Sequence, residues 1–332
     1  MTMKTIMRNL VLPPKFYNSY WLNRLGIQPL RIILDRFFWY LRPMRVSPEF
    51  RSTLSALEQN GYVVIENFLP QEDFQRLREE FKASFNPDNA DIRNRVSGKN
   101  LIEEIDVLES NQQSYALSRR LFLMSETIRK IVQWAAHKKI RLPMACIMQR
   151  LSIESYKDKK NVILHQSEDF DAETILHQDA SLPIYKAWLY LDDVGTEDGA
   201  FVYAPKSNRL TFERLKYEYR RSCQLMKMQM GRTDELPKEN LYLGRYVPSP
   251  ADRKALGIEE KSMTGKANTL VIANTLGFHR RGNIEPGRIR SVLHLDFKRL
   301  QSGLNLIPFA GKIPHLEKLI LQNRRPEKVL QY

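Results

Sequence analysis

The sequence has few cysteines, and its apolar segments are short. Among 332 residues only Cys146 and Cys223 are cysteines, and neither forms part of a C-x-x-C pair. This argues against a disulfide-rich secreted scaffold and gives a reducing cytoplasm as the expected location. The apolar run at 30–41 is shorter than the roughly 20 residues that span a bilayer. Residues 1–15 lack the apolar stretch and the cleavage site of a signal peptide.

Acidic residues are outnumbered by basic ones. The 52 Lys and Arg against 38 Asp and Glu give a net charge of +14. The excess is concentrated in residues 1–51, with nine basic and two acidic residues, and in 206–232, with eight and two. Such segments attract anionic partners, including phospholipid, an acyl-CoA, a phosphorylated sugar or nucleic acid. Because no helix-turn-helix, zinc-finger or RNA-recognition pattern accompanies them, no nucleic acid is expected as a partner.

The basic N-terminal extension, residues 1–45, contains a predicted amphipathic helix at 30–41. Its apolar residues share one helical face, and Arg31, Asp35 and Arg36 lie on the other side. Two interpretations remain open. The helix packs on the rest of the protein, or it lies in the interface of an anionic membrane. The second interpretation places the protein peripherally on the inner face of a membrane.

The remaining chain predicts an α+β domain over residues 46–310, followed by a C-terminal helix at 311–332. A basic helical insert at 206–262 interrupts the strands. Numerous short strands with helices before and between them predict a β-barrel or sandwich buttressed by helices. Strands are predicted at 61–66, 145–153, 173–177, 185–191, 200–203, 267–273 and 288–297, and helices from Pro70 and at 101–108 and 114–136.

Three residues predict a metal site. His177 and Asp179 are two residues apart after an apolar run, so in a strand they share a face. An iron site of two histidines and one carboxylate needs a second histidine. Among the six histidines, His279 follows a long apolar strand and stands at its end, where ligands gather.

A cationic group for an anionic ligand is predicted close to His279. Arg288 and Arg290 open the strand 288–297 and are two residues apart, so we expect both to face the same side. An inward guanidinium can hold a carboxylate through two hydrogen bonds. For Arg288 a surface salt bridge is an equally good interpretation.

Five stretches, taken in order, resemble the phytanoyl-CoA dioxygenase family of iron(II)/2-oxoglutarate-dependent oxygenases. The resemblance covers about residues 50–300. The stretches are NGYVVIENFL at 60–69, HQD at 177–179, AWLYLDDV at 187–194, DGAFVYAPKSNR at 198–209 and FHRRG at 278–282 followed by Arg290.

This resemblance implies a double-stranded β-helix, or cupin-like jelly-roll, core. It implies that His177, Asp179 and His279 bind Fe(II), with 2-oxoglutarate as co-substrate and O2 as oxidant. It favours Arg290 over Arg288 as the partner of the distal 2-oxoglutarate carboxylate. Trp188 matches a tryptophan that lines the 2-oxoglutarate pocket, and Gln149 is a further candidate there.

The implied function is hydroxylation of an unactivated carbon in an anionic small-molecule or lipid-like substrate. Related halogenases have a small residue at the position of Asp179, so this aspartate favours hydroxylation. The insert is predicted to form a lid over the barrel mouth. Two alternatives remain: a membrane-peripheral hydroxylase of a lipid or lipopolysaccharide precursor, and a non-catalytic jelly-roll binding module.

Overall fold

A computed structural model describes residues 20–40, 48–86, 88–97, 100–107, 144–152, 172–179, 184–229 and 247–297. The chain divides into two compact units. Unit 1 comprises residues 1–44, 210–235 and 300–332, and unit 2 comprises 45–209 and 236–299. Whether 1–45, 46–310 and 311–332 are the domain boundaries stays a prediction.

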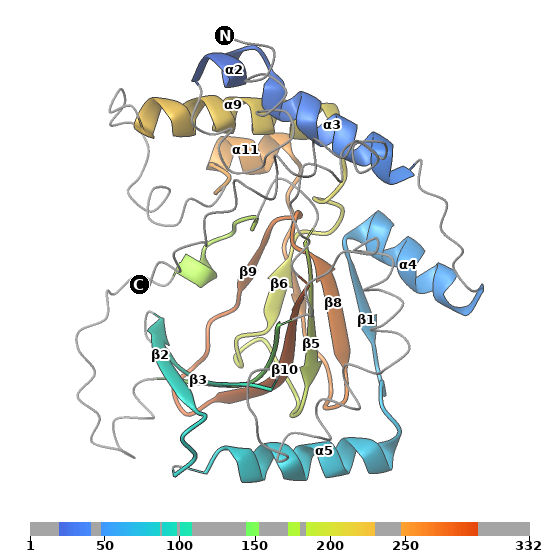
Figure 1. Ribbon diagram of the computed structural model, residues 1–332, viewed down its shortest axis with the longest axis vertical. Helices are drawn as coiled ribbons and strands as arrows, with labels where there is room; N and C mark the ends of the chain where they lie inside the picture. Colours follow the sequence, from blue (N-terminus) through green and yellow to red (C-terminus); the bar gives the residue numbers. More distant parts are fainter. Residues whose placement is uncertain are drawn as a thin grey trace, which may run out of the picture. The chain divides into compact units, whose positions relative to one another are not determined.

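The described elements are helices and antiparallel strands, with three helices before the first strand and runs of strands later in the chain (Figure 1). None of the helices in these residues is both long and apolar enough to cross a bilayer. In chain order the elements are α2 (Tyr20–Arg24), α3 (Ile27–Tyr40), α4 (Pro48–Asn60), β1 (Tyr62–Ile65), α5 (Gln71–Ser84), β2 (Arg93–Ser97), β3 (Asn100–Asp106), β4 (Met144–Ser152), η4 (Ala172–Thr174), β5 (Tyr185–Tyr190), β6 (Phe201–Tyr203), α9 (Phe212–Gln229), α11 (Pro250–Ala255), β7 (Lys261–Met263), β8 (Leu270–Asn274), β9 (His279–Arg281) and β10 (Ile289–Phe297).

Unit 2 is built on two antiparallel sheets. The larger sheet has the order β1-β8-β5-β10-β4-β3-β2, and the smaller has the order β7-β6-β9. Side chains from both sheets meet in one apolar core, which includes Ile102, Met148, Tyr190, Val271 and Val292 from the larger sheet and Phe201, Tyr203 and Met263 from the smaller. This arrangement of helices and a two-sheet jelly roll confirms the predicted α+β fold class.

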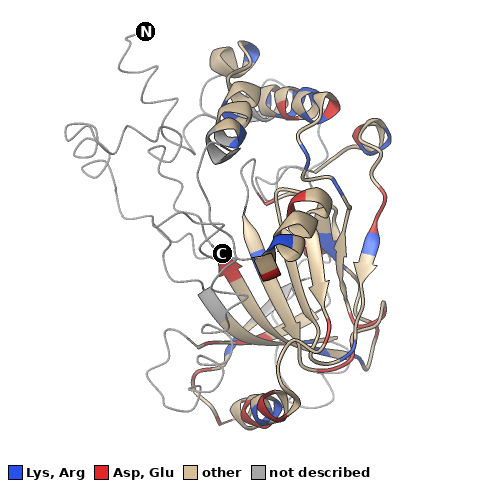
Figure 2. Cartoon of the chain, turned by 90° about the vertical axis from the view of Figure 1, so that its right-hand side faces the viewer, with Lys and Arg blue, Asp and Glu red and all other residues tan. Residues whose placement is uncertain are grey.

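Alternation along the strands defines which side chains face the space between the sheets. Met148 on β4, Tyr190 on β5 and Val292 on β10 belong to the shared core, so residues two positions away on the same strand also face inward. Most strand residues are uncharged, as the mostly tan colour of the strands in Figure 2 shows. A charge on an inward-facing position calls for a physical reason, such as an ion pair or a bound ligand.

Helix α5 follows its sequence signals closely. Pro70 stands at the N-cap, and Glu72 and Asp73 lie in the first turn, where carboxylates interact favourably with the helix dipole. Phe74, Leu77 and Phe81 are buried, at the three- and four-residue spacing of one helical face. The predicted helix from Pro70 is confirmed.

Two predicted elements are wrong. Residues 101–108 were expected to form a helix, but Asn100–Asp106 is strand β3. Both faces of β3 are buried, so the two-residue alternation that would reveal a strand is missing. The strand expected at 173–177 is instead the 3-10 turn η4, followed by an isolated bridge at His177. The helices predicted at 114–136 and 311–332 lie outside the described residues.

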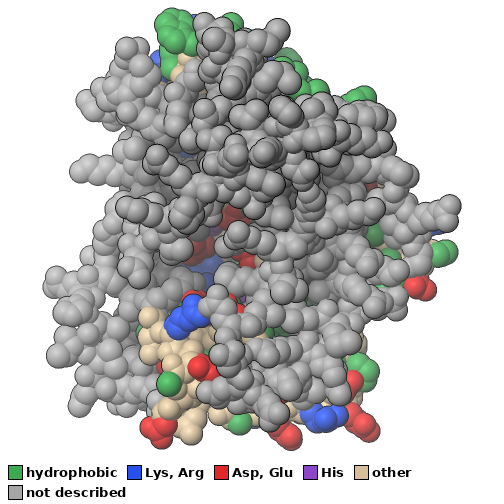
Figure 3. Space-filling model, viewed as in Figure 1, with side chains coloured by type: hydrophobic (Ala, Val, Ile, Leu, Met, Phe, Trp, Pro, Cys, Tyr) green, Lys and Arg blue, Asp and Glu red, His purple; other side chains and the backbone are tan. Residues whose placement is uncertain are grey.

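Unit 1 contains the described helices α2, α3 and α9, with α9 packed against the other two. The Tyr219 hydroxyl donates a hydrogen bond to the Arg24 carbonyl at 3.1 Å. On α9 the polar Arg214 and Glu218 are buried as an ion pair at 3.1 Å, whereas Phe212 is exposed. Hydrophobic side chains also lie at the surface of this unit (Figure 3). The lid role of the insert stays a prediction.

Candidate metal centre

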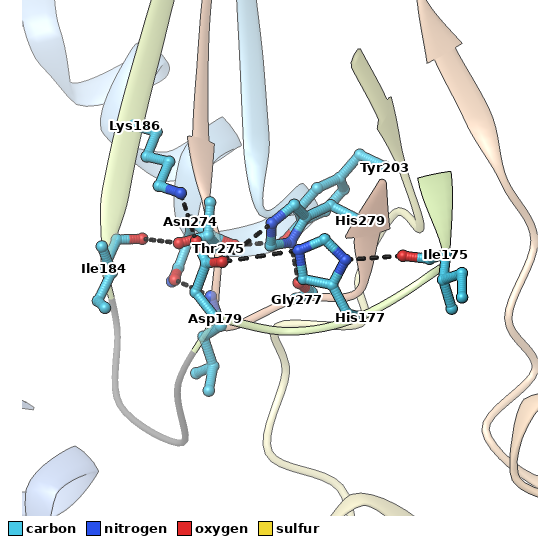
Figure 4. Close-up of polar contacts among 11 residues, drawn as sticks. Ile175, His177, Asp179, Ile184, Lys186, Tyr203, Asn274, Thr275, Gly277 and His279 are labelled. Atoms are coloured by element: carbon cyan, nitrogen blue, oxygen red, sulfur yellow. Dashed lines mark hydrogen bonds and ion pairs between the residues drawn. The ribbon is translucent and has the colours of Figure 1, made fainter. Parts of the chain in front are cut away.

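Backbone pairing brings the three predicted metal ligands together. The N–H of His177 donates to the carbonyl of His279 at 2.9 Å, and the N–H of His279 donates to the carbonyl of His177 at 2.8 Å. The N–H of Asp179 donates to the Thr275 carbonyl at 3.2 Å. Residues about a hundred positions apart are therefore fixed to one another by main-chain hydrogen bonds (Figure 4).

The two imidazoles are held in the orientation that a metal needs. Nδ1 of His177 lies 2.7 Å from the Ile175 carbonyl, and Nδ1 of His279 lies 2.9 Å from the Gly277 carbonyl. A carbonyl only accepts, so each Nδ1 must carry the proton. Each Nε2 is then left with its lone pair directed toward Asp179, and the ring centroids are 4.6 Å apart.

The carboxylate of Asp179 has two different oxygen environments. Oδ1 lies 3.7 Å from Nε2 of His177 and 3.6 Å from Nε2 of His279. Oδ2 lies 2.8 Å from Nζ of Lys186. Burial by itself raises the pKa of Asp179, but its interactions with the His279 ring and the Lys186 ammonium outweigh burial and hold that pKa well below its usual range. The aspartate is therefore an anion at neutral pH.

These ligand atoms fit a divalent iron. All three lie within 4.8 Å of one another, and no other group of this kind occurs among the residues that the structure describes. Two neutral imidazoles and one carboxylate on one side of a metal form the facial set that Fe(II) oxygenases use, with the other positions open. The tethered Nδ1 atoms supply the outer hydrogen bonds that orient metal-binding histidines.

Trp188 faces the interior of the barrel close to this centre. Its ring stacks on Phe201 with centroids 4.2 Å apart, and on His294 at 5.5 Å with an interplanar angle of 6°. Phe201 in turn lies 5.6 Å from the ring of His279. An aromatic chain thus connects Trp188 to one predicted metal ligand.

Arg290 and Arg288 occupy very different environments. Arg290 is buried on β10 and donates a hydrogen bond from Nη1 to the Gly199 carbonyl. Burial lowers the pKa of this guanidinium, which Tyr190 and Asp198 partly oppose. Arg288 is exposed and pairs with Glu197 at 3.2 Å. It precedes the strand, in a turn closed by its N–H and the Glu285 carbonyl, so strand alternation does not extend to it.

The candidate on β4 is Arg150 rather than Gln149. Arg150 is two residues from the core residue Met148, is buried, and lies opposite Arg290 in the β4–β10 pairing. Gln149 therefore lies on the outer face of the strand, and the structure does not bring it to the site. Sequence reasoning missed Arg150 and also Lys186, although Lys186 stands two residues before Trp188 and so shares its inward face.

Comparison with known proteins identifies the family. A sequence model of the phytanoyl-CoA dioxygenase family (PhyH) matches residues 57–235, which is more than half of the chain. The chain belongs to the phytanoyl-CoA dioxygenase family. It is therefore an iron(II)/2-oxoglutarate-dependent oxygenase, with O2 as the oxidant, as the resemblance in the sequence implied. No curated protein sequence matches the chain.

The chain is similar to several solved structures. The epimerase SnoN from nogalamycin biosynthesis is 14% identical, with a TM-score of 0.48 over 76% of this chain and 83% of its own. EctD from S. alaskensis, solved with 2-oxoglutarate and 5-hydroxyectoine, is 13% identical, with a TM-score of 0.48 over 79% and 80%. HygX from Streptomyces hygroscopicus, solved with nickel and 2-oxoglutarate, is 15% identical, with a TM-score of 0.43 over 75% and 87%.

Proposed function

We propose that this oxygenase is a hydroxylase in which His177, Asp179 and His279 hold the iron and Arg290 holds the distal carboxylate of 2-oxoglutarate. The observation that carries the proposal is the position of Asp179 Oδ1 within 3.7 Å of both Nε2 atoms. When bound, iron and 2-oxoglutarate supply the oxidising power that inserts one oxygen atom of O2 into a C–H bond. Because an aspartate occupies position 179, no place is left there for a halide, which favours hydroxylation over halogenation.

The chain's own residues position the reactants and exclude water. His177 and His279 are 1% and 5% exposed, and Arg290 is 6% exposed. In such an enclosed site, charges interact more strongly than they do in water. A buried guanidinium is costly unless an anion meets it, and the distal carboxylate of 2-oxoglutarate is the anion we assign to Arg290. Trp188 supports the wall of the same pocket through its stack on Phe201.

The substrate that we propose is an anionic small molecule or a lipid-like molecule. What supports this choice is the net charge of +14 and the buried Arg150 beside the proposed 2-oxoglutarate anchor. The carbon that is oxidised would be decided by side chains at the barrel mouth. These lie in loops, where members of one fold differ most.

A succinate-release assay tests this function. Purified protein with Fe(II), 2-oxoglutarate and O2 would be screened against pools of carboxylated, phosphorylated and acylated metabolites. We expect one pool to raise succinate release above the background rate, and its product to gain one oxygen atom from 18O2. Asp179→Ala should abolish both signals. A protein that binds neither iron nor 2-oxoglutarate would instead support the non-catalytic binding module.

A second candidate is a membrane-peripheral hydroxylase of a lipid or lipopolysaccharide precursor. It is favoured by the row of exposed apolar side chains on α2 and α3. Running the same assay with lipid extracts presented in vesicles would separate the two candidates. Turnover of a vesicle-borne lipid with none among water-soluble pools would support the membrane enzyme, and the reverse result would remove it.

A further inference from the structure

Unit 1 exposes most of the large apolar side chains found at the described surface. Six of the seven exposed large hydrophobic residues belong to it, and Ile289 alone belongs to unit 2. The six are Trp21, Leu25, Leu30, Ile33, Phe37 and Phe212. Trp21 is 73% exposed and Leu25 is 83% exposed. Single exposed apolar residues are ordinary on soluble proteins, whereas a concentration of them marks an interaction site.

Helix α3 is turned with its apolar side outward. Leu30, Ile33 and Phe37 follow three- and four-residue steps, so they form a stripe along one side of the helix. The opposite side is buried and mixed, with the polar Gln28 and Arg31 beside the apolar Ile32. A helix that packs on a water-soluble core buries its large apolar stripe, whereas α3 exposes this one. Trp21 on α2 and Leu25 in the turn that follows it are four residues apart, and the Leu25 N–H donates to the Trp21 carbonyl at 3.0 Å, so both lie on a common side.

Helix α9 adds basic groups to the surface of this unit. Phe212, Lys216 and Arg220 are exposed at four-residue spacing. The Lys216 ammonium lies 4.4 Å from the centre of the Phe212 ring, which places a cation directly beside an exposed aromatic side chain. An aromatic ring next to a basic group is the side-chain combination found at membrane–water interfaces.

The charge of the protein is concentrated in unit 1. Its residues include 18 Lys and Arg and 7 Asp and Glu, a net charge of +11 out of the total of +14. An anionic bilayer attracts such a unit and an apolar face anchors it, because basic side chains reach headgroups while apolar ones enter the acyl boundary. A partner protein with an apolar groove would explain the exposed apolar stripe, but it would not explain the concentration of basic residues in this unit.

We propose that α2 and α3 form a docking surface for an anionic phospholipid membrane. In this arrangement Trp21, Leu25, Leu30, Ile33 and Phe37 enter the interface, while the basic residues of unit 1 contact the headgroups. The proposed surface binds the protein to one face of the membrane and does not span the bilayer. The proposal concerns where the protein works and is independent of the reaction that it catalyses.

Vesicle co-sedimentation of the full chain tests the docking surface. The vesicles would be phosphatidylcholine alone, and phosphatidylcholine with phosphatidylglycerol. We expect binding to the anionic vesicles to fall at least tenfold in high salt and at least tenfold in the double variant Ile33→Glu, Phe37→Glu. Both positions are exposed, so folding should be retained, which circular dichroism would verify.

Ile289→Glu is the matched control, because it also puts a carboxylate at an exposed apolar position, but in unit 2. It should bind anionic vesicles like the parent protein. The proposal fails if the parent protein does not bind anionic vesicles, or if Ile289→Glu weakens binding as much as the double variant does. It also fails if light scattering shows a dimer that the double variant disperses, because the face would then be covered by a second copy.

A second inference comes independently from the two oxygens of Asp179. Lys186 Nζ contacts Oδ2 at 2.8 Å, whereas Oδ1 is the oxygen that faces both histidine Nε2 atoms (Figure 4). Lys186 projects from β5 on the same inward face as Trp188. Its charge-assisted bond is of the strong, short kind that fixes the rotation of a carboxylate. Oδ2 is therefore held by Lys186, and Oδ1 is left facing the metal position.

We infer that Lys186 is a positioning residue that keeps Asp179 bound to the metal through one oxygen. This inference rests on the proposed function. A carboxylate that turned and used both oxygens would occupy one more position on the metal. That position is needed, because 2-oxoglutarate and O2 together require every place that the three protein ligands leave open.

Water-proton relaxation of the protein loaded with Mn(II) gives a readout that does not depend on turnover. A one-oxygen Asp179 leaves about three metal-bound waters, and a two-oxygen Asp179 leaves about two. We expect Lys186→Met to lose about one water, and Lys186→Arg to restore it. Lys266→Met is the matched control, because Lys266 contacts Asp193 at the same 2.8 Å on the exposed surface. Lys266→Met should have the same number of metal-bound waters as the parent protein.

The outcomes separate this inference from the proposed function. If Mn(II) binds equally well to the parent protein and to Asp179→Ala, the metal centre itself is misassigned. If the parent binds Mn(II) through Asp179 but Lys186→Met keeps the same number of waters, only the role of Lys186 is refuted. A loss of water in Lys186→Met that Lys186→Arg does not restore would also refute it.

Discussion

Arg150 on β4 and Arg290 on β10 lie opposite each other in the strand pairing, and both side chains are buried. Burial of a charged side chain costs free energy because the group loses its hydration, and for Arg290 burial lowers the pKa of the guanidinium. A carboxylate bound beside Arg290 offsets part of that cost. We therefore expect 2-oxoglutarate to stabilise this protein even before any substrate is added.

The first prediction concerns the anchor of 2-oxoglutarate. Arg290→Met should raise the KM for 2-oxoglutarate by about 30- to 1,000-fold, because loss of a buried, hydrogen-bonded charge costs roughly 2–4 kcal/mol. Arg288→Met should change it less than about threefold, since that side chain is exposed and already pairs with Glu197 at 3.2 Å and with Asp198 at 3.9 Å. Succinate release measured against 2-oxoglutarate concentration tests both. Equal effects of the two variants would contradict the assignment.

The second prediction tests which residue of β4 faces the interior. 2-Oxoglutarate with Mn(II) should raise the melting temperature of the parent protein and of Gln149→Met by similar amounts. In Arg150→Met the increase should be clearly smaller, because the buried cation opposite Arg290 is gone. Thermal scans at several ligand concentrations measure this. If Gln149→Met were the more damaged variant, the strand register would have to be revised.

The third prediction concerns the metal. Asp179→Ala should weaken Co(II) binding by at least about a hundredfold, because one of three ligands and its charge are lost. Calorimetric titration of the chelator-treated protein measures the affinity. His294→Ala, which removes a histidine stacked on Trp188 instead of a predicted ligand, should bind Co(II) within about threefold of the parent. Tight binding retained in Asp179→Ala would overturn the site.

The fourth prediction is a dependence of stability on alkaline pH. Burial raises the pKa of Tyr190 to about 12, and its hydroxyl donates to the Met263 carbonyl at 2.5 Å. Because the pKa of Tyr190 is higher in the folded state than in the unfolded state, where it is about 10, protonated Tyr190 stabilises the fold. This contribution to the free energy of unfolding is complete below pH 10 and is lost as the pH rises toward 12.

Between pH 10 and 12 the free energy of unfolding should fall by roughly 3 kcal/mol, which corresponds to a pKa difference of about two units between the folded and unfolded states. Tyr190→Phe lacks the ionisable group, so its unfolding free energy should fall less steeply between pH 10 and 12. Urea titrations of both proteins at each pH measure the difference. Parallel curves for the two proteins would show that Tyr190 titrates normally.

Much of the fold was predictable because local signals agree with it. Pro70 and the two acidic residues after it mark the start of α5, and β10 reads as an apolar run bounded by charged residues. The metal-site residues also came together as expected, although His177 lies in an isolated bridge instead of a strand. The spacing of His177 and Asp179 is enough to bring both to one point even without a regular strand.

What could not be predicted depends on partners far away in the sequence. Gln149 and Arg150 are equally acceptable on either face of β4, and only the pairing with β10 shows which one is inward. Lys186 carries no motif of its own, and its role emerges only when Asp179 is placed 2.8 Å away. The side on which α3 turns its apolar stripe likewise depends on what buries Gln28 and Arg31.

The paired main-chain hydrogen bonds between His177 and His279 have a consequence for how the centre can open. Each histidine is the backbone partner of the other, so a movement that separates the two segments breaks both hydrogen bonds. The backbone positions of the two ligands are therefore coupled, and opening of the centre costs free energy on both sides at once.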